Sequence, residues 1–437
     1  MTFNRESLEG TLLDFARVGG IDLMARCGAF HSWLESRREH HTFPYSRVLR
    51  GPTGPHAQAM YETGDAGGGI NFASQDYLSM SCHPRIADAA SRAIREHGVH
   101  SAGSAIVLGN TQPSLALERA LADTLERTQT VLYPTGWGAG YGTVVALVRP
   151  FDHIVMDQLA HACLQSGAAA ATRNIVITPH LDVPSMIEAV RTIRKTDTKN
   201  GILVITESLF SMDSDTPQLA PLQAACTDLG ATLLVDVAHD FGALGPNGTG
   251  HIGLQNLLGG IDLVMGAFSK TFASNGGFVV CNSAAVRDQL KIFGGPHTFS
   301  NALSPVQASI VLEVLTIVRS DEGEERRRKL LANSNALRSR FSHHGIECLG
   351  EPSAIVPVPI GAEAVGRVAS WLLFQRGLLA NLVEYPAVRA KTARFRMQVM
   401  ADHEIDQMAP AADLVVECLA EARDLVSRQF PDLLETA

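Results

Sequence analysis

Lys270 is the only cationic residue in the stretch Asp262 to Val280, DLVMGAFSKTFASNGGFVV, where its neighbours are small, hydroxylic or apolar. Lysine is rarely buried without a partner, because desolvation of an ammonium group is costly. In apolar surroundings the amine loses its proton more readily and attacks carbonyl groups, with which it forms a Schiff base. The sequence therefore makes Lys270 a candidate reactive amine.

Other polar side chains follow apolar runs in the same way. Asp236 ends the run ATLLV, and His239 follows it three residues later. A carboxylate in that position needs a cationic or hydrogen-bonded partner. A capping aspartate with a structural histidine is one interpretation, and a metal site is another, although no further ligands lie nearby in the sequence. Ser211 falls in a turn after GILVITE, and His161 opens a helix after HIVM; that histidine alone would be structural.

A glycine-rich turn, TGWGAGYG, follows the run TVLYP. Such a turn at a helix N-terminus can hold a phosphate with backbone N–H groups, or it can simply allow tight packing. A dinucleotide fingerprint is the rival interpretation, typical of a nicotinamide dehydrogenase. The spacing does not fit GxGxxG, because Tyr141 stands where the third glycine belongs, and no acidic residue follows at the expected distance.

These four features together predict pyridoxal phosphate. This cofactor needs a lysine, an acid at its ring nitrogen, a phosphate cradle and a group that lies over its ring. Lys270, Asp236, the loop around Gly136 and His161 offer these in turn, each at the end of a predicted strand. We expect no metal.

Seven short apolar runs position these residues, and helical stretches separate them. Such alternation predicts βαβ units and a mostly parallel sheet buried on both faces, with ligands outside the carboxyl ends of the strands. Pro84 and Gly98 bracket one well-marked helix. The runs are TVLYP, HIVMD, NIVITPH, GILVITES, ATLLVDVAHD, DLVMGAF and GGFVVCN.

The sequence predicts three segments. Residues 1–65 form an N-terminal arm, with helical periodicity in SLEGTLLDFA and RCGAFHSWLESRREHH and irregular connections in RVLRGPTGPHAQ and GDAGGGI. Residues 66–303 form the large cofactor-binding domain. Residues 304–437 form a smaller C-terminal α/β domain that opens with two long helical segments.

Composition excludes several classes of protein. The 437 residues are 46% apolar and 19% charged, which is ordinary for a folded protein. A net charge of −9 argues against a nucleic-acid binder. No apolar run approaches the roughly 20 residues that span a bilayer, and the N-terminus lacks a secretory pattern. Seven scattered cysteines suit a reducing compartment, so we expect a cytoplasmic protein.

The chain resembles the α-oxoamine synthases, which are pyridoxal-phosphate enzymes with the aspartate-aminotransferase fold (fold type I). The resemblance covers about residues 70 to 428 and implies a large, mostly parallel seven-stranded domain with a smaller C-terminal domain. The motifs that carry it are INFASQDYLSMSCHP, GVHSAGSAIVLGN, LYPTGWGAGYG, DQLAHACLQSGA, TESLFSMDSDTPQLAPLQ, LLVDVAHDFGALGPNGTG, GAFSKTFASNGGFV, TFSNALSP and ARFRMQVMADHE.

The resemblance implies roles for the residues that face the cofactor. Lys270 would hold it covalently and, once freed, act as a base, while Asp236 would pair with its ring nitrogen. His239 and Ser211 would bind its phenolic oxygen. His161 would stack on its ring and assist catalysis.

The resemblance also implies groups at the phosphate and at the substrate. Backbone N–H groups of Gly136 and Trp137 would contact the phosphate, and Ser300 from a partner subunit is a further candidate there. Arg396, in preference to Arg394, would grip the amino-acid carboxylate.

Several positions depart from the family pattern. Ala267 replaces a common phosphate-binding hydroxyl, and Ser269, Thr271 or the partner's Ser300 are alternative substitutes. Gln75 replaces an asparagine that touches the substrate region. The sequence also has Val237 and Asp240 in the DEAH-like motif, and SAGSAIVLGN in place of the GTR pattern of glycine-using members. These departures concern the substrates and not the cofactor.

The activity implied is a Claisen-type condensation of glycine, alanine or serine with an acyl thioester, usually with loss of CO₂, to give an α-amino ketone. The acyl donor would be coenzyme A or a carrier protein, and the enzyme a homodimer with a shared active site. An aminotransferase or C–C lyase of the same fold is the nearest alternative. A non-enzymatic scaffold should lack some of the cofactor groups.

Overall fold

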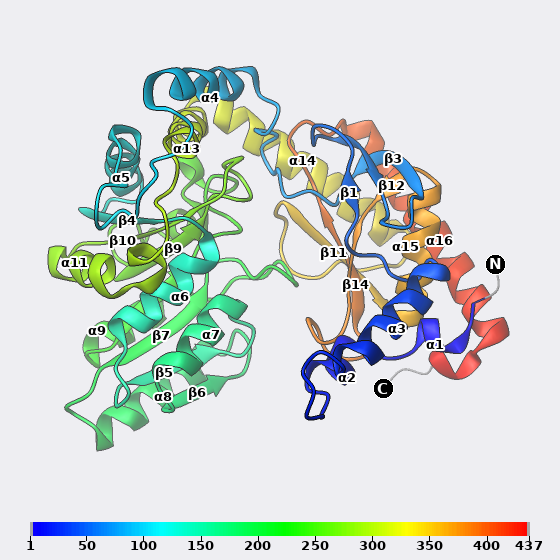
Figure 1. The fold of residues 1–437 in the computed structure, drawn as a ribbon, viewed down its shortest axis with the longest axis horizontal. Coiled ribbons are helices and arrows are strands. Elements are labelled where there is room, and N and C mark those ends of the chain that lie inside the picture. Colours follow the sequence, from blue (N-terminus) through cyan, green and yellow to red (C-terminus); the bar gives the residue numbers. More distant parts are fainter. Residues whose placement is uncertain (1–2, 435–437) are drawn as a thin grey trace. The chain divides into compact units, whose positions relative to one another are not determined.

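A computed structural model of the chain describes residues 3–434, which belong to two compact units. The first, here called the seven-stranded unit, comprises Asp76–Ser211 and Asp215–Arg328. The second, here called the two-sheet unit, comprises Met1–Gln75, Met212–Ser214 and Lys329–Ala437. Figure 1 labels the elements of both units.

The seven-stranded sheet is mostly parallel. Its β10 strand runs antiparallel to both neighbours, β4 and β9, and the remaining pairs are parallel. Valine, isoleucine and leucine fill the central strands, which are buried along their whole length as expected for a sheet covered on both faces. All seven predicted strands are confirmed. Their spatial order is β4 (Gln129–Tyr133), β10 (Gly277–Cys281), β9 (Leu263–Ala267), β8 (Thr232–Asp236), β7 (Ile202–Glu207), β5 (His153–Asp157) and β6 (Ile175–Thr178).

Helices pack against this sheet (Figure 1). Residues of α6 (Gly136–Leu147), α7 (Ala162–Ala171) and α11 (Ala284–Phe293) share one apolar core with the strands. In addition, α8 (Val183–Thr196) packs on α9 (Leu219–Asp228) and on β5. The remaining helices of the unit are α4 (Pro84–His97), α5 (Gln112–Thr124), η1 (Pro246–Gly248), α10 (Gly250–Leu254), α12 (Gly295–Thr298) and α13 (Pro305–Val318).

The helix predicted between Pro84 and Gly98 is confirmed as α4. His83 caps its N-terminus by accepting the backbone N–H of Arg85, and Pro84 is its first residue. Gly98 follows the last residue with φ +76°, in the left-handed region where glycine ends a helix without strain.

The two-sheet unit holds two small sheets and their helices. One sheet has the order β1 (Val48–Leu49), β2 (His56–Met60), β3 (Ala66–Asn71), β12 (Leu378–Leu379), and the other β11 (Ile355–Gly361), β14 (Ala393–Gln398), β13 (Asn381–Val383). The helices are α1 (Arg5–Leu8), α2 (Leu12–Ala16), α3 (Cys27–Glu39), α15 (Glu363–Gln375), η2 (Ile405–Gln407), α16 (Met408–Gln429) and η3 (Pro431–Leu434). The long α14 (Asp321–His343) begins in the seven-stranded unit.

The prediction of irregular connections before residue 71 was wrong, because β2 and β3 form a regular antiparallel pair there. The glycines that suggested a loop serve close packing instead. A Cβ on Gly69 would lie 1.8 Å from the carbonyl oxygen of Gly377, and a Cβ on Gly68 would lie 2.6 Å from that of Ala57. Glycine allows two backbones to approach this closely.

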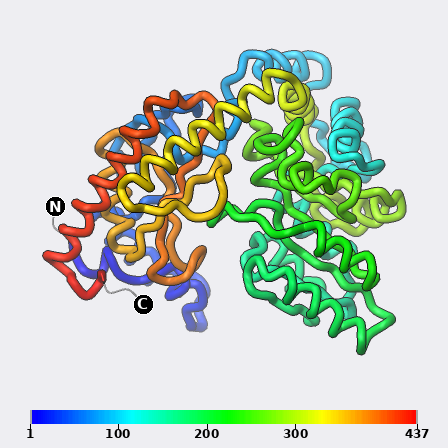
Figure 2. The backbone as a smooth tube through the Cα atoms, turned by 180° about the vertical axis from the view of Figure 1, so that it is seen from behind, coloured from blue at the N-terminus to red at the C-terminus, as the bar shows by residue number. Residues whose placement is uncertain are grey.

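The N-terminal residues pack on the C-terminal part of the chain. Arg367 forms an ion pair of 2.7 Å with Glu384 and donates to the backbone oxygens of Leu8 and Gly10. Figures 1 and 2 show the blue N-terminal segment beside the red C-terminal helix, where Arg5 pairs with Asp432. The contacts of Arg367 are buried and the Arg5 pair is exposed, and together they connect the first helices to the C-terminal part of the chain.

The compact units divide the chain differently from the three predicted segments. The seven-stranded unit extends to Arg328, because α13 packs on α4 and α5. The first 75 residues join the C-terminal part in one unit. The functional division into an arm (1–65), a large domain (66–303) and a small domain (304–437) stays a prediction.

Among residues 3–434, no helix combines the length and apolar character needed to cross a bilayer. In the same described range, no three His, Cys, Asp or Glu side chains are arranged to hold a metal ion.

Candidate active site

A cavity of about 270 Å³ lies in the seven-stranded unit, among residues that end or follow its strands. Strands β7, β8 and β9 contribute Glu207, Asp236 and Ala267, each the last residue of its strand. The position agrees with the rule that ligands bind outside the carboxyl ends of parallel strands. The lining residues are Thr135, Gly136, Trp137, His161, Cys163, Glu207, Asp236, Ala238, His239, Met265, Ala267, Ser269, Lys270, Asn275 and Gly276.

The cavity brings together six of the predicted site residues, and the other four lie elsewhere. Ser211 occupies a turn beyond β7, and Ser300 lies next to α12; neither lines the cavity. Gln75 and Arg396 belong to the two-sheet unit. The six that line it are Gly136, Trp137, His161, Asp236, His239 and Lys270.

Asp236 is buried at the end of β8. Its Oδ1 accepts the backbone N–H of Ala238 at 2.9 Å. Burial raises the pKa of the Asp236 carboxyl group, while the charges of Lys270 and His161 oppose that shift. A cationic group placed against this carboxylate would therefore be strongly attracted to it.

His161 caps the N-terminus of α7, and its protonation state follows from its contacts. Its Nδ1 accepts the backbone N–H of Cys163 at 3.3 Å and lies 3.0 Å from the Sγ of the same residue. Burial lowers the pKa of the imidazole, so the ring is neutral. Because Nδ1 accepts, the contacts assign the ring proton to Nε2.

His239 is held by a residue that sequence reasoning missed. The hydroxyl of Tyr77 lies 2.9 Å from Nδ1 of His239, and both side chains are buried. Tyr77 belongs to the QDYL motif, in which only Gln75 was considered. This contact fixes the orientation of the imidazole.

The glycine-rich turn opens α6 as predicted. Thr135 is the N-cap, and its Oγ1 accepts the backbone N–H of Gly138 at 2.9 Å. The first N–H groups of a helix have no intrahelical partner and lie at its positive end. A Cβ on Gly136 would lie 2.4 Å from that of Ala267, so glycine is required for the close approach to β9.

Ser269, one of the hydroxyls considered as a substitute at Ala267, lines the cavity, whereas Thr271 does not. The Thr271 hydroxyl is buried without a hydrogen-bond partner. Within this chain, Ser269 is thus the better-placed candidate.

The two candidate arginines lie on β14 in the two-sheet unit. Arg394 forms an ion pair with Asp213. An Nη of Arg396 lies 3.9 Å from Sδ of Met212. Asp213 therefore neutralises the charge of Arg394 within this unit.

Glu207 and Cys163 are lining residues that sequence reasoning did not select. Glu207 directly follows the apolar run ILVIT. The rule that selected Asp236, a carboxylate at the end of a buried strand, would have found it. Cys163 gave no such signal, since small-residue surroundings suit an ordinary core cysteine.

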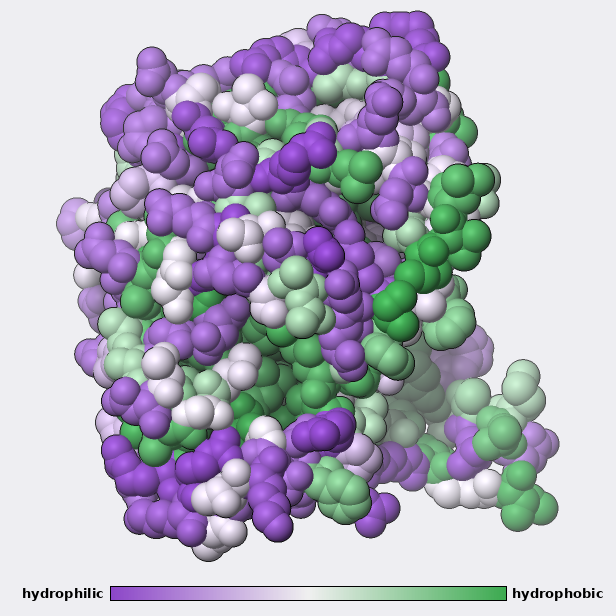
Figure 3. Space-filling model, turned by 90° about the vertical axis from the view of Figure 1, so that its left-hand side faces the viewer, coloured by the Kyte–Doolittle hydropathy of each residue, from purple (hydrophilic) through white to green (hydrophobic). Residues whose placement is uncertain are grey.

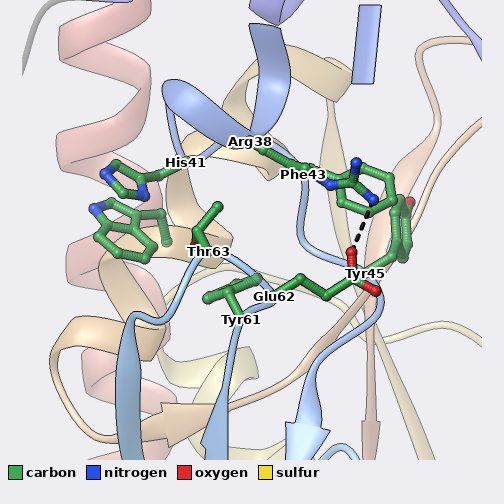
Figure 4. Close-up of a pocket in the computed structure, with 8 residues that line it drawn as sticks. Arg38, His41, Phe43, Tyr45, Tyr61, Glu62 and Thr63 are labelled. Atoms are coloured by element: carbon green, nitrogen blue, oxygen red, sulfur yellow. Dashed lines mark hydrogen bonds and ion pairs between the residues drawn. The ribbon is translucent and has the colours of Figure 1, made fainter. Parts of the chain in front are cut away.

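A second hollow lies in the two-sheet unit (Figure 4). There Arg38 pairs with Glu62 at 2.8 Å, and His41 stacks on Trp371 with ring centroids 3.9 Å apart. Its volume is about 10 Å³, the space of a single water molecule. It is too small for a substrate.

His180 links the end of β5 to the loop that follows β7 and makes stability depend on pH. Its ring nitrogens lie 3.0 Å from Asp157 and 3.1 Å from Asp215. Burial lowers the pKa of His180, but hydrogen bonds and charges of the two aspartates outweigh burial and raise it from 6.5 to about 9.

The folded state therefore binds this proton more tightly than the unfolded chain. The stabilisation is fully present below pH 6.5 and is lost as the pH rises through 9. We expect the difference in unfolding free energy between the wild type and His180→Asn to fall by up to about 3 kcal/mol between pH 6 and pH 10. Denaturant unfolding at both pH values measures it, and an unchanged difference would contradict the assignment.

The residues of the cavity at the strand ends fit pyridoxal phosphate. A lysine and a buried carboxylate face the same space, a neutral imidazole lies beside them, and a helix N-terminus opens into it. The volume is near the lower end for small-ligand pockets, about 300–1,000 Å³. This combination defines the class of protein as an enzyme that binds pyridoxal phosphate through a lysine.

Comparisons with known proteins agree with the geometry. The family model for aminotransferase class I and II matches residues 68–415. The 8-amino-7-oxononanoate synthase of Klebsiella pneumoniae is 33% identical over 340 residues, which are 78% of this chain and 86% of that protein. The 4-hydroxy-2,2'-bipyrrole-5-methanol synthase PigH of Serratia sp. is 28% identical and covers 94% of this chain, which spans 62% of PigH.

A solved structure of serine palmitoyltransferase from S. paucimobilis, with bound PLP–myriocin, is also similar. It superposes with a TM-score of 0.84 and 25% identity, and covers 92% of this chain and 99% of that one. The chain belongs to the class I and II aminotransferase family and, within it, to the α-oxoamine synthases, which are pyridoxal-phosphate-dependent acyltransferases. The predicted fold, family and cofactor are thus confirmed.

Proposed function

We propose that this enzyme condenses a small L-amino acid (glycine, alanine or serine) with an acyl thioester, releases CO₂ and forms an α-amino ketone. The observation that carries the proposal is that Lys270, Asp236 and His161 face one cavity at the strand ends. The relatives named as 8-amino-7-oxononanoate synthase and serine palmitoyltransferase support it.

In this proposal the residues of the chain divide the work. Bound pyridoxal phosphate supplies an electron sink that stabilises negative charge at the α-carbon of the amino acid. Asp236 accepts a hydrogen bond from the ring nitrogen and keeps it protonated. Lys270 holds the cofactor, and its freed Nζ removes the α-proton. His161 offers its Nε2–H to the oxygen of the thioester carbonyl as that oxygen gains charge.

Further groups would orient the cofactor and the substrate. His239 and Ser211 bind the phenolic oxygen, and the backbone of Gly136 and Trp137 contacts the phosphate. Arg396 binds the carboxylate of the amino acid, a task for which its planar guanidinium is suited. Gln75 lies in the segment that would contact the substrate.

The acyl donor is a coenzyme A or a carrier-protein thioester, since both present the same reactive carbonyl. The proposal is tested by mixing enzyme, amino acid and acyl-CoA thioesters of increasing length and measuring free thiol and CO₂. Thiol release that requires the amino acid is the expected result. Conversion of the amino acid to an oxo acid without thiol release would show an aminotransferase instead, and aldehyde formation without thiol release would show a lyase.

We also propose a homodimer with a shared active site, to which the partner contributes Ser300. The proposal is supported by two segments of the seven-stranded unit that pair with each other within the chain. Ser104 forms a β-bridge with Asn301, and the backbone N–H of Ala302 donates to the carbonyl oxygen of Gly103. Val107, Leu108 and Phe299 leave large apolar side chains exposed there. Figure 3 shows this side of the molecule, where green apolar residues lie among the purple hydrophilic ones.

Sedimentation of the purified enzyme tests the dimer. We expect a dimer in the wild type and a monomer of low activity in Phe299→Glu. A fully active wild-type monomer would contradict the shared site.

A cytoplasmic location is part of the proposal. All seven cysteines fall within the described residues and none forms a disulfide, which suits a reducing compartment. Cell fractionation with an antibody to the protein tests the location, and recovery outside the cytoplasm would refute it.

A further inference from the structure

Three buried carboxyl groups end adjacent strands at the edge of the sheet where the cavity lies. Asp157, Glu207 and Asp236 end the adjacent strands β5, β7 and β8, and they are 1%, 4% and 5% exposed. Glu207 is the register partner of Asp236. Since register partners on parallel strands point to the same face, these two carboxyl groups are neighbours in one low-dielectric space. Asp157 is level with Thr206, so its side chain points to the opposite face of the sheet.

Asp157 and Asp236 have cationic groups nearby. Asp157 lies 3.0 Å from His180, which the two aspartates around it keep protonated. Asp236 faces the cavity together with Lys270 and would face the ring nitrogen of the cofactor. Asp236 can therefore remain ionised although it is buried.

Glu207 lies near the same lysine but has no ion pair among the described residues. Among residues 3–434, no lysine, arginine or histidine side chain forms an ion pair with it. Its neighbours are the two aspartates, Lys270 across the cavity, neutral His161 and the thiol of Cys163. Its carboxyl group accepts a hydrogen bond from the backbone N–H of His161. Ionisation would place a second buried negative charge beside that of Asp236.

We propose that Glu207 is a protonated carboxylic acid in the working enzyme and a positioning residue for His161. By accepting the N–H of His161, it fixes the turn that caps α7, in which Nδ1 of the ring is committed to Cys163. The Nε2–H of His161 is thereby held toward the cavity. Because Glu207 stays neutral, Asp236 is the single ionised carboxylate against the cofactor.

The direction of its pKa agrees with this geometry. Burial and the adjacent charge of Asp236 raise the pKa of Glu207 well above its ordinary value, and these outweigh the opposing effects of the His161 hydrogen bond and of Lys270. The inference rests on the proposed roles of Asp236 and His161, but the protonation of Glu207 can be observed without turnover.

Two substitutions of Glu207 distinguish the effect of its missing charge from the effect of its shape. Glu207→Gln keeps the length and the accepting oxygen without a charge, and Glu207→Ala removes both. We expect kcat/KM of Glu207→Gln within about threefold of wild type and that of Glu207→Ala reduced at least about tenfold. The cofactor absorbance of Glu207→Gln should titrate with the same midpoint as wild type. Glu188→Gln, on the exposed surface of α8, is the matched control.

Infrared difference spectroscopy of holoenzyme at pH 8, wild type minus Glu207→Gln, tests protonation directly. The expected spectrum contains the carbonyl stretch of a protonated carboxyl group. The spectrum of wild type minus Glu188→Gln should lack this band. A carboxylate band in its place would overturn the proposal, as would a titration midpoint in Glu207→Gln shifted by about one pH unit or more. Equal activity of Glu207→Gln and Glu207→Ala would overturn the positioning role. A synthase assay that fails while the infrared band is present would leave this inference standing and refute only the proposed reaction.

Discussion

Replacement of Lys270 by alanine is expected to abolish both the cofactor's covalent attachment and the condensation. The alanine side chain has no amine to bond to the cofactor aldehyde and no base to remove the α-proton, so two functions disappear together. We expect turnover to fall by at least about a thousandfold, the scale of general-base catalysis with covalent chemistry. Absorbance of the purified variant and thiol release measure the two losses separately.

Lys195→Ala is the matched control for this variant. Lys195 is an exposed lysine on α8 of the same unit, where it pairs loosely with Glu188 at 3.8 Å. It should retain the cofactor absorbance and the wild-type rate. A Lys270→Ala variant with substantial turnover would mean that another group carries the chemistry.

Asp236→Asn is expected to retain cofactor but to lose most of the rate of proton abstraction. The amide keeps the shape of the side chain but removes the negative charge that holds the ring nitrogen protonated. An opposite charge at about 4 Å contributes about 4 kcal/mol at an effective dielectric near 20. Loss of that interaction corresponds to a fall in kcat of about a thousandfold.

Exchange of the α-hydrogen of the amino acid with deuterium, measured without thioester, isolates this step. The exchange should slow as much as kcat does, whereas KM for the amino acid should change little. Asp228→Asn, an exposed aspartate at the end of α9, is the control. Exchange at the wild-type rate in Asp236→Asn would refute the role assigned to that carboxylate.

The sheet could be predicted because its physical signal is local. Runs such as GILVIT and ATLLV are buried on both faces, so each strand is apolar along its whole length. Once the runs were placed, Asp236, His161 and Lys270 stood at strand ends by sequence position alone. The helix N-terminus at Gly136 followed from the glycine-rich turn.

What the sequence did not reveal depends on contacts between distant residues. Gly69 suggested a loop, since the backbone of Gly377 that packs against it is about 300 residues away in the chain. Tyr77 is an ordinary buried aromatic until its hydroxyl is seen beside His239. Glu207 carried a usable signal, but only the strand order and register reveal that it stands beside Asp236.

Reduction of the purified enzyme with borohydride, followed by peptide mapping, tests the central claim most directly. The account predicts that the cofactor becomes permanently attached to one peptide, the one containing Lys270, at the Nζ of that residue. Attachment to a different lysine, or recovery of unlabelled peptides throughout, would contradict it.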